Sequence, residues 1–150
     1  MPLPVRKKLR LRGFDYTTPT SYFVTICTHQ KRCIFGAPDQ LNPIGQIVQN
    51  HLLRLPDHFP GLVIDQSVVM PNHVHILLTL HQQGPDLSHI IGSFKAGVAR
   101  EIHQSVSDLT VWQKSFHDHI PRSEKDWQDI WTYIDQNPLR WELDCFYSPS

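Results

Sequence analysis

The chain has 150 residues, a hydrophobic fraction of 40% and a formal net charge of zero from 14 basic and 14 acidic side chains. This length and composition predict one compact domain with its own core and exclude a disordered chain. The neutral total argues against a nonspecific nucleic-acid binder, and no apolar run approaches the roughly 18 residues that span a bilayer, so we expect no membrane partner.

Basic residues gather at the start of the chain. Five of them lie within the first twelve positions, namely Arg6, Lys7, Lys8, Arg10 and Arg12. No apolar stretch follows them, so this segment is not a secretion signal. Such a run is either a solvated tail or a contact surface for DNA phosphates, and the sequence leaves both open. We predict a single domain over residues 1–150, with a basic tail at about residues 1–12.

The first regular elements are a strand and a helix. Residues 22–28 are rich in β-branched and aromatic side chains, which favours a strand. Asn42 and Pro43 then predict the start of a helix, with an N-cap followed by proline at the first helical position. We expect Pro56 to end this helix. Its apolar residues follow at helical spacing: Ile44, Ile47, Val48, Leu52 and Leu55.

Two strands and a second helix come next. Residues 62–70 and 73–80 predict an antiparallel pair, joined by a tight turn at Pro71 and Asn72. Asp86 can then cap a helix. The buried stripe of that helix is predicted to contain Leu87, Ile90, Ile91, Phe94, Val98 and Ile102.

The last part of the chain predicts a short strand over residues 115–120 and a final helix. Ser123 and Asp126 resemble a capping box at the start of that helix, and Pro138 is expected to end it. The predicted order is therefore β-α-β-β-α-β-α. This order indicates an α+β fold, a ferredoxin-like antiparallel sheet (βαββαβ core) with helices on the sheet and a further C-terminal helix.

A His-x-His pair is the most informative motif of the chain. His73 and His75 flank Val74 on a predicted strand, where alternate side chains point to the same face. Two neutral imidazoles side by side can hold a metal ion but leave its shell incomplete, which is typical of a catalytic metal. The other interpretation is a pair of histidines packed on a half-buried sheet, and the motif alone does not decide between them. The ligand type alone favours manganese or zinc.

Tyr133 and Asn137 are four residues apart on the final helix, so they share one of its faces. Helical spacing places both at the border between the apolar stripe and solvent. They are either ordinary boundary residues or, together with the histidines, the parts of a site for phosphodiester transesterification. In that second interpretation, a metal ion favours the phenolate of Tyr133 and draws charge from a phosphate oxygen.

Several blocks, in this order, resemble the REP-associated tyrosine transposases, single-tyrosine members of the HUH endonuclease superfamily related to small insertion-sequence transposases. The blocks are residues 10–16 (RLRGFDY), 22–29 (YFVTICTH), 69–75 (VMPNHVH), 93–95 (SFK), 111–113 (VWQ), 133–134 (YI) and 137–141 (NPLRW). The resemblance covers roughly residues 10–144.

The resemblance implies a function and a site. His73, His75 and Asn137 match the metal ligands of the family, the metal being Mg²⁺ or Mn²⁺, and Tyr133 matches the nucleophile that forms a 5′-phosphotyrosyl link. The implied substrate is single-stranded DNA next to a hairpin of a palindromic repeat in a bacterial genome. The implied protein is a monomer or homodimer, cytoplasmic and associated with the nucleoid. This location agrees with the three scattered cysteines, which predict reduced thiols.

Other residues have two open interpretations. Lys95 and Arg100 either contact DNA phosphates or belong to a solvated helix face. His117 and His119 form a second His-x-His pair. His119 matches a histidine that is common in the family, and it is a possible accessory to the site whose role the sequence does not define.

Three functions are therefore compared. The leading one is a metal-dependent transposase that cleaves and joins single-stranded DNA through Tyr133. The alternative is a domesticated protein that binds hairpin DNA without turnover. A small structural metal-binding domain is disfavoured, because the pair of histidines is open and no cysteine ligands accompany it.

Overall fold

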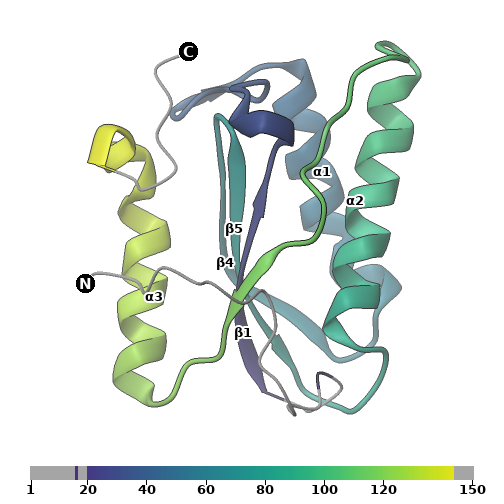
Figure 1. Cartoon of the computed structure of the whole chain (residues 1–150). Helices are drawn as coiled ribbons and strands as arrows, with labels where there is room; N and C mark the ends of the chain where they lie inside the picture. Colours follow the sequence, from purple (N-terminus) through teal and green to yellow (C-terminus); the bar gives the residue numbers. More distant parts are fainter. Residues whose placement is uncertain (1–15, 17–19, 144–150) are drawn as a thin grey trace.

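A four-stranded antiparallel sheet forms the centre of the computed structural model, which describes residues 16 and 20–143 (Figure 1). Its strands are β1 (Ser21–Cys27), β4 (Leu62–Met70), β5 (His73–Leu80) and β6 (His117–His119). They lie in the order β4-β5-β1-β6, with every neighbouring pair antiparallel. This is the strand order of a ferredoxin-like sheet, so the predicted fold class is confirmed.

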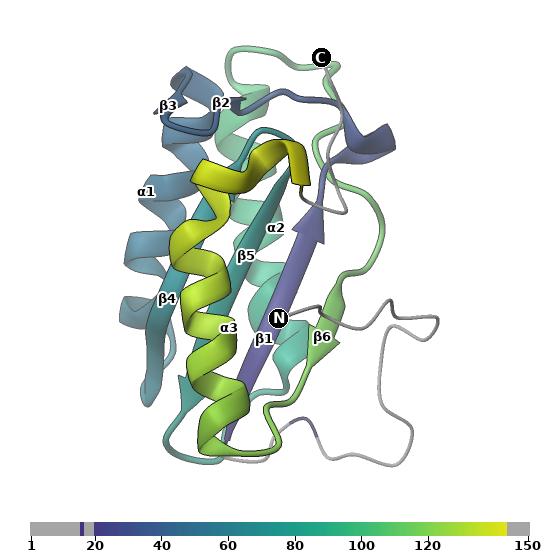
Figure 2. The same ribbon diagram turned by 90° about the vertical axis from the view of Figure 1, so that its left-hand side faces the viewer.

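Helices cover both faces of this sheet. The α1 (Pro43–His58) and α2 (Leu87–His103) helices lie on one face, and α3 (Glu124–Gln136) lies alone on the other (Figures 1 and 2). The larger hydrophobic cluster fills the space under α1 and α2 and includes Val74, Ile76 and Leu78 of β5. A second, small cluster under α3 is formed by Phe23, Leu77, Ile130 and Ile134.

Each helix begins at a residue whose side chain accepts a backbone hydrogen bond. Asn42 accepts from Gly45 at 2.8 Å, Asp86 accepts from His89 at 2.9 Å, and Ser123 accepts from Asp126 at 3.1 Å. These caps satisfy amides that have no partner within the helix, so the predicted helix starts are confirmed. The six residues predicted for the buried stripe of α2 are also the six that are buried.

The end of α1 was predicted too early. The helix continues through Pro56 to His58. A proline in the last turn of a helix removes one backbone hydrogen bond without breaking the turn, and here the amide of Phe59 donates to the carbonyl of Pro56. The prediction was wrong by two residues because it treated this proline as a stop signal.

Two strands are shorter than their composition suggests, the first at its end and the fourth at both ends. β1 ends at Cys27, and Thr28 forms only an isolated bridge with Trp112. The fourth strand was expected over residues 115–120 but pairs only from His117 to His119. Ser115 has φ 66°, in the left-handed region, and this conformation cannot belong to a strand.

Four short elements were not predicted. They are η1 (His29–Lys31), the two strands β2 (Gly36–Ala37) and β3 (Gln40–Leu41), and η2 (Asn137–Leu143). Each lacks the apolar periodicity that marks a longer element. The η1 and η2 turns matter most, because both lie at the end of the sheet where the β4–β5 turn is found (Figure 2).

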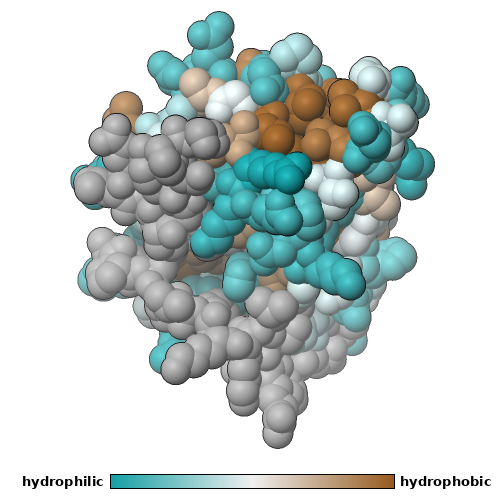
Figure 3. Space-filling view, turned by 45° about the horizontal axis from the view of Figure 1, so that its top comes forward, coloured by the Kyte–Doolittle hydropathy of each residue, from teal (hydrophilic) through white to brown (hydrophobic). Residues whose placement is uncertain are grey.

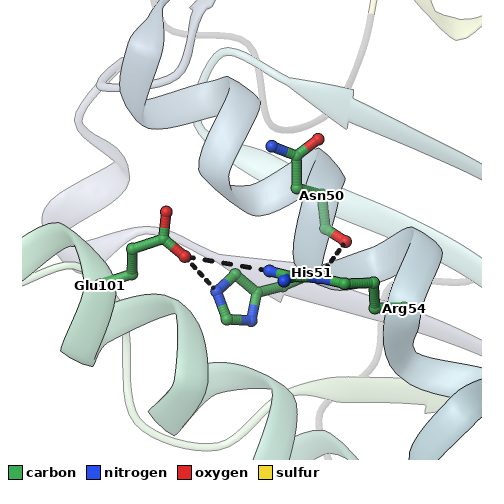
Figure 4. A network of polar contacts seen from close by, with 4 residues as sticks. All are labelled: Asn50, His51, Arg54 and Glu101. Atoms are coloured by element: carbon green, nitrogen blue, oxygen red, sulfur yellow. Dashed lines mark hydrogen bonds and ion pairs between the residues drawn. The ribbon is translucent and has the colours of Figure 1, made fainter.

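A polar network joins α1 to α2 on the face opposite α3. His51 donates to the carboxylate of Glu101 at 2.8 Å, and Nη2 of Arg54 lies 3.9 Å from the same oxygen (Figure 4). The Nε atom of Arg54 also donates to the backbone carbonyl of Asn50. These contacts hold the two helices together on the far side of the sheet from the histidine pair.

No helix among the described residues is long and apolar enough to cross a membrane.

Candidate active site

β5 places His73 and His75 side by side on the face of the sheet that α3 covers. Both side chains are fully buried, and their ring centroids are 4.5 Å apart. The intervening Val74 points into the larger cluster on the opposite face. The alternation of side chains along an extended strand therefore brings the two imidazoles together.

Each imidazole is held through its Nδ1 atom. His73 Nδ1 lies 2.8 Å from Oδ1 of Asn72, and His75 Nδ1 lies 2.9 Å from Oγ1 of Thr25. Thr25 reaches His75 because the two residues are direct partners in the β1–β5 ladder. In both rings, Nδ1 is therefore the nitrogen that these partners hold, and Nε2 is the other.

Tyr133 and Asn137 come from the helix above. The ring of Tyr133 is half-buried, and its centroid lies 5.4 Å from that of His75 and 6.2 Å from that of Phe23. Asn137 is the C-cap of α3, one turn after Tyr133, and is only 3% exposed, so it is more buried than its place on the helix predicted. Trp141 of η2 borders the other side, with its ring 6.0 Å from that of His73.

These residues present a ligand set suited to a divalent cation. The Nε2 atoms of His73 and His75 and the Oδ1 atom of Asn137 are buried, and within the described part of the chain none of these three atoms has a hydrogen-bond partner. Burying a polar atom without a partner is costly, which points to a ligand that is bound there in the working protein. Two imidazole nitrogens and one amide oxygen would leave positions open for phosphate and water.

Sequence comparison decides the family. The family model described as "Transposase IS200 like" matches residues 20–137, which include all four candidate site residues. The chain belongs to the IS200-like transposase family. Among its relatives is an uncharacterized protein of Haemophilus influenzae that is 32% identical, with 95% of this chain and 93% of the relative covered. A proposed REP-associated tyrosine transposase of the same organism is 24% identical, over 84% of this chain and 74% of the relative.

Solved structures show the same fold. A REP-associated tyrosine transposase bound to a REP hairpin matches this IS200-like transposase with a TM-score of 0.68 and 21% identity, covering 87% of this chain and 73% of the other. A proposed transposase from Deinococcus radiodurans matches with a TM-score of 0.57 and 20% identity, over 85% and 95% of the two chains. The predicted resemblance to this group is confirmed.

The end of the transposase that carries the site has a mixed surface. The β4–β5 turn, η1 and η2 meet at this end, which is uppermost in Figure 1. Hydrophobic and hydrophilic side chains adjoin there, as the space-filling view shows (Figure 3). Such a surface can contact both the apolar faces of bases and the charged backbone of a nucleic acid.

Of the predicted DNA-contact residues, the two that the structure describes, Lys95 and Arg100, lie on α2 and not beside the histidine pair. Lys95 donates from Nζ to the backbone carbonyls of Gln113 and Ser115, both at 2.9 Å, and so braces the loop before β6. Arg100 is exposed on α2, on the opposite face of the sheet from α3. Arg6, Lys7, Lys8, Arg10 and Arg12 lie outside the described residues. Phosphate contacts by these seven residues stay a prediction.

The second His-x-His pair faces the same side of the sheet as the first. His117 and His119 pair with Thr25 and Phe23 of β1, whereas Asp118 points to the other face and accepts a hydrogen bond from Tyr16 at 3.0 Å. His119 Nε2 donates to Asp126 Oδ2 at 3.0 Å. His119 therefore ties the edge strand β6 to the first turn of the tyrosine-bearing helix.

Asp126 is the acceptor in this interaction between β6 and α3. Burial of its carboxylate opposes ionisation, but hydrogen bonds from the Arg122 amide and from His119 outweigh that effect and lower the pKa of Asp126 below its ordinary value. A carboxylate whose pKa is lowered by folding stabilises the fold above its unfolded pKa, and this contribution is lost as the pH falls through the folded pKa. The interaction between His119 and Asp126 therefore weakens in acid.

We expect Asp126→Asn to lower the free energy of unfolding by roughly 1 kcal/mol near neutral pH, because a charged acceptor is lost. The difference in free energy of unfolding between the variant and the parent should shrink as the pH falls below about 4, because the carboxylate of the parent then begins to take up a proton. Urea unfolding at several pH values measures this. Asp129→Asn is the matched control, since among the described residues Asp129 pairs with the exposed Lys125 four residues away and should contribute little. Equal effects of the two changes at every pH would contradict the prediction.

Sequence reasoning missed the residues that orient the histidines. Thr25 looked like an ordinary strand residue, and its role depends on the register between β1 and β5. Asn72 was interpreted only as a turn residue. Its position directly before the first histidine was the available signal, because a short amide side chain there can reach the neighbouring ring.

Proposed function

We propose that this IS200-like transposase is a metal-dependent single-stranded DNA endonuclease and strand transferase that cleaves next to hairpins through a 5′-phosphotyrosyl intermediate. The observation that carries the proposal is the contact between the rings of Tyr133 on α3 and His75 on β5, with the ring of His73 beside that of His75. A candidate nucleophile and two metal-type ligands are thereby neighbours, as a phosphodiester transesterase requires.

His73 and His75 would hold the metal through Nε2 and Asn137 through Oδ1, and Mg²⁺ or Mn²⁺ are the ions we propose. When bound, such an ion withdraws charge from a phosphate oxygen and favours the ionised form of a nearby tyrosine. The protein's own contribution is to keep the ligands in place, since the hydrogen bond that Asn72 Oδ1 accepts from His73 Nδ1 and the one between Thr25 Oγ1 and His75 Nδ1 hold both rings before any ion arrives. The remaining positions stay available to the substrate.

Tyr133 would supply the attacking oxygen. A tyrosine hydroxyl has an ordinary pKa near 10, so it must lose its proton before or during attack. Its oxygen forms a bond to phosphorus, the bond from phosphorus to the 3′ oxygen breaks, and the leaving strand keeps a free 3′ hydroxyl after taking up a proton. The 5′ end remains on Tyr133 until another 3′ hydroxyl attacks the same phosphorus and releases the tyrosine.

The relatives and the geometry both support this substrate class. A solved structure with the same fold is a transposase bound to a REP hairpin. A tyrosine held on a helix also needs a scissile phosphate that can be turned into the space beside β5, and an unpaired strand bends there at little cost. Bases of such a strand can stack on aromatic side chains, each for about 1–3 kcal/mol, which permits binding by a chain of zero net charge.

A cleavage assay tests the proposal. The full chain is incubated with end-labelled single-stranded DNA that carries a hairpin, or with the fully paired duplex of the same sequence, in Mn²⁺, Mg²⁺ or chelator. We expect a covalent protein–DNA adduct and a shortened strand with the hairpin and metal only. Hairpin binding without any adduct would favour the alternative, a DNA-binding protein without turnover. Equal cleavage of duplex and hairpin would contradict the proposed substrate.

A further inference from the structure

We propose that Asn72 is a positioning residue that selects the tautomer of His73 and so keeps the Nε2 lone pair available for the metal. This inference rests on the proposed function, because it concerns the ligand that His73 would supply to the metal. Asn72 itself is 1% exposed and lies in the turn between β4 and β5. It therefore acts through His73 and does not need to touch the substrate.

The backbone of the β4–β5 turn is held in place by the segment that follows β1. The carbonyl of Asn72 accepts from the amide of Thr28 at 3.0 Å, and the carbonyl of Pro71 accepts from the amide of Phe35 at 3.1 Å. The hydroxyl of Thr28 also lies 3.1 Å from the carbonyl oxygen of Asn72. Because both peptide groups of the turn are fixed in this way, the Asn72 side chain starts from a defined position.

The contacts of the Asn72 amide decide which way it faces. Its Nδ2 atom donates to the backbone carbonyl of Lys31 at 3.2 Å. A carbonyl oxygen can only accept, so the NH₂ group of Asn72 must point to Lys31 and the amide oxygen must point the other way. That oxygen lies 2.8 Å from Nδ1 of His73. An amide oxygen also can only accept, so Nδ1 of His73 must carry the proton.

The consequence concerns the other nitrogen of the ring. A neutral imidazole has one N–H, so a proton on Nδ1 leaves Nε2 with its lone pair. The Nε2 atom of His73 is the one proposed to bind the metal, and it is buried, as are Nε2 of His75 and Oδ1 of Asn137. The tautomer that can ligate a metal is thus chosen by a chain of three groups, from the Lys31 carbonyl through the Asn72 amide to the His73 ring.

The Lys31 carbonyl is presented by an unusual turn. Gln30 and Lys31 have φ 55° and 56°, a left-handed conformation that few residues other than glycine adopt. The turn is closed by hydrogen bonds from the Lys31 amide to Thr28 and from the Arg32 amide to His29. Backbone strain of this kind is maintained only where the surroundings hold it, and here it aims a carbonyl at Asn72.

His75 differs in this respect. Its Nδ1 partner is the hydroxyl of Thr25, which can either donate or accept a hydrogen bond. Thr25 therefore orients the ring of His75 without selecting its tautomer. The two histidines are unequal in the metal-free protein, and Thr25→Val is the matched control for a change at Asn72.

The first measurement is a long-range ¹H–¹⁵N correlation spectrum of the metal-free, ¹⁵N-labelled full chain, which reports the tautomer of each imidazole. We expect His73 to be protonated at Nδ1 in the parent and in Asn72→Asp, which keeps an acceptor there. In Asn72→Leu we expect a mixture of tautomers at His73, whereas Thr25→Val should leave His73 unchanged. A parent His73 protonated at Nε2, or an unaltered tautomer in Asn72→Leu, would overturn the inference.

The second measurement is Mn²⁺ affinity by calorimetry on the same proteins. Loss of a partner that orients a metal-binding histidine typically costs roughly 10- to 100-fold in affinity, so we expect that loss in Asn72→Leu and not in Asn72→Asp. An equal loss in both variants would assign Asn72 a purely structural role through Lys31. If Asn72→Leu does not fold, the parent and Asn72→Asp spectra still decide the question. Failure of the parent to bind Mn²⁺ would refute the proposed function, whereas the tautomer of His73 is tested independently.

Discussion

Tyr133→Phe should abolish the covalent protein–DNA adduct, a loss of at least about 10³-fold in cleavage, while DNA affinity changes by no more than about twofold. The hydroxyl is the proposed nucleophile, and the ring supplies the packing. That ring makes edge contacts with His75 and Phe23, which phenylalanine retains. Denaturing gels with labelled hairpin DNA measure the adduct, and a binding titration on the same DNA measures affinity.

Tyr22→Phe provides a control for the loss of a tyrosine hydroxyl elsewhere. Tyr22 is fully buried in the larger cluster, on the opposite face of the sheet from α3. Its substitution can lower stability but should leave the adduct in place under conditions where the protein is folded. A phenylalanine variant at position 133 that still forms the adduct would refute the assignment of the nucleophile.

His73→Ala and His75→Ala should each weaken Mn²⁺ binding by more than about 100-fold and remove cleavage, because each change deletes one of the proposed ligands. Chelator should have the same effect on the parent protein. Asn137→Ala should be milder, since water can replace a weak amide ligand. Calorimetry on the metal-free proteins measures the affinity, and the hairpin assay measures cleavage.

Buried histidines also contribute to packing, so the control must separate folding from metal binding. Melting temperatures of all variants are compared without metal. When Mn²⁺ is added, the parent and Asn137→Ala should gain stability, whereas His73→Ala and His75→Ala should not. His81→Ala, at an exposed position just beyond β5, should behave like the parent in both measurements. Full cleavage by the parent after verified removal of metal would contradict the proposed mechanism.

Strong local patterns predicted most of the fold. The strands β4 and β5 have the predicted bounds, since each is a run of β-branched and aliphatic residues between clear turn residues. The capped helix starts and the buried stripe of α2 were predicted for the same reason. Prediction of element ends from the sequence failed where a single backbone conformation decided the end, as at Ser115. It also failed where a proline lay in the last turn of a helix, as at Pro56.

The candidate site was predictable only in part. Alternation along β5 predicted that His73 and His75 share a face, and helical spacing predicted that Tyr133 and Asn137 share another. That these two faces meet depends on α3 packing across the sheet through a small hydrophobic cluster, which no local pattern reveals. The partners of the histidines come from β1 and from a neighbouring turn, so they depend on strand register and loop contacts.

The full burial of His73 and His75 has a consequence for how strongly an ion can be held. Each ring is fixed by its neighbours and by a hydrogen bond at Nδ1, so its rotamer freedom has already been lost on folding. Metal binding then requires little further ordering of these two ligands, and more of the intrinsic bond strength becomes observed affinity. Tyr133, in contrast, is only half-buried. Preorganisation is thus concentrated on the two histidines, the proposed metal ligands, and less on Tyr133, the proposed nucleophile.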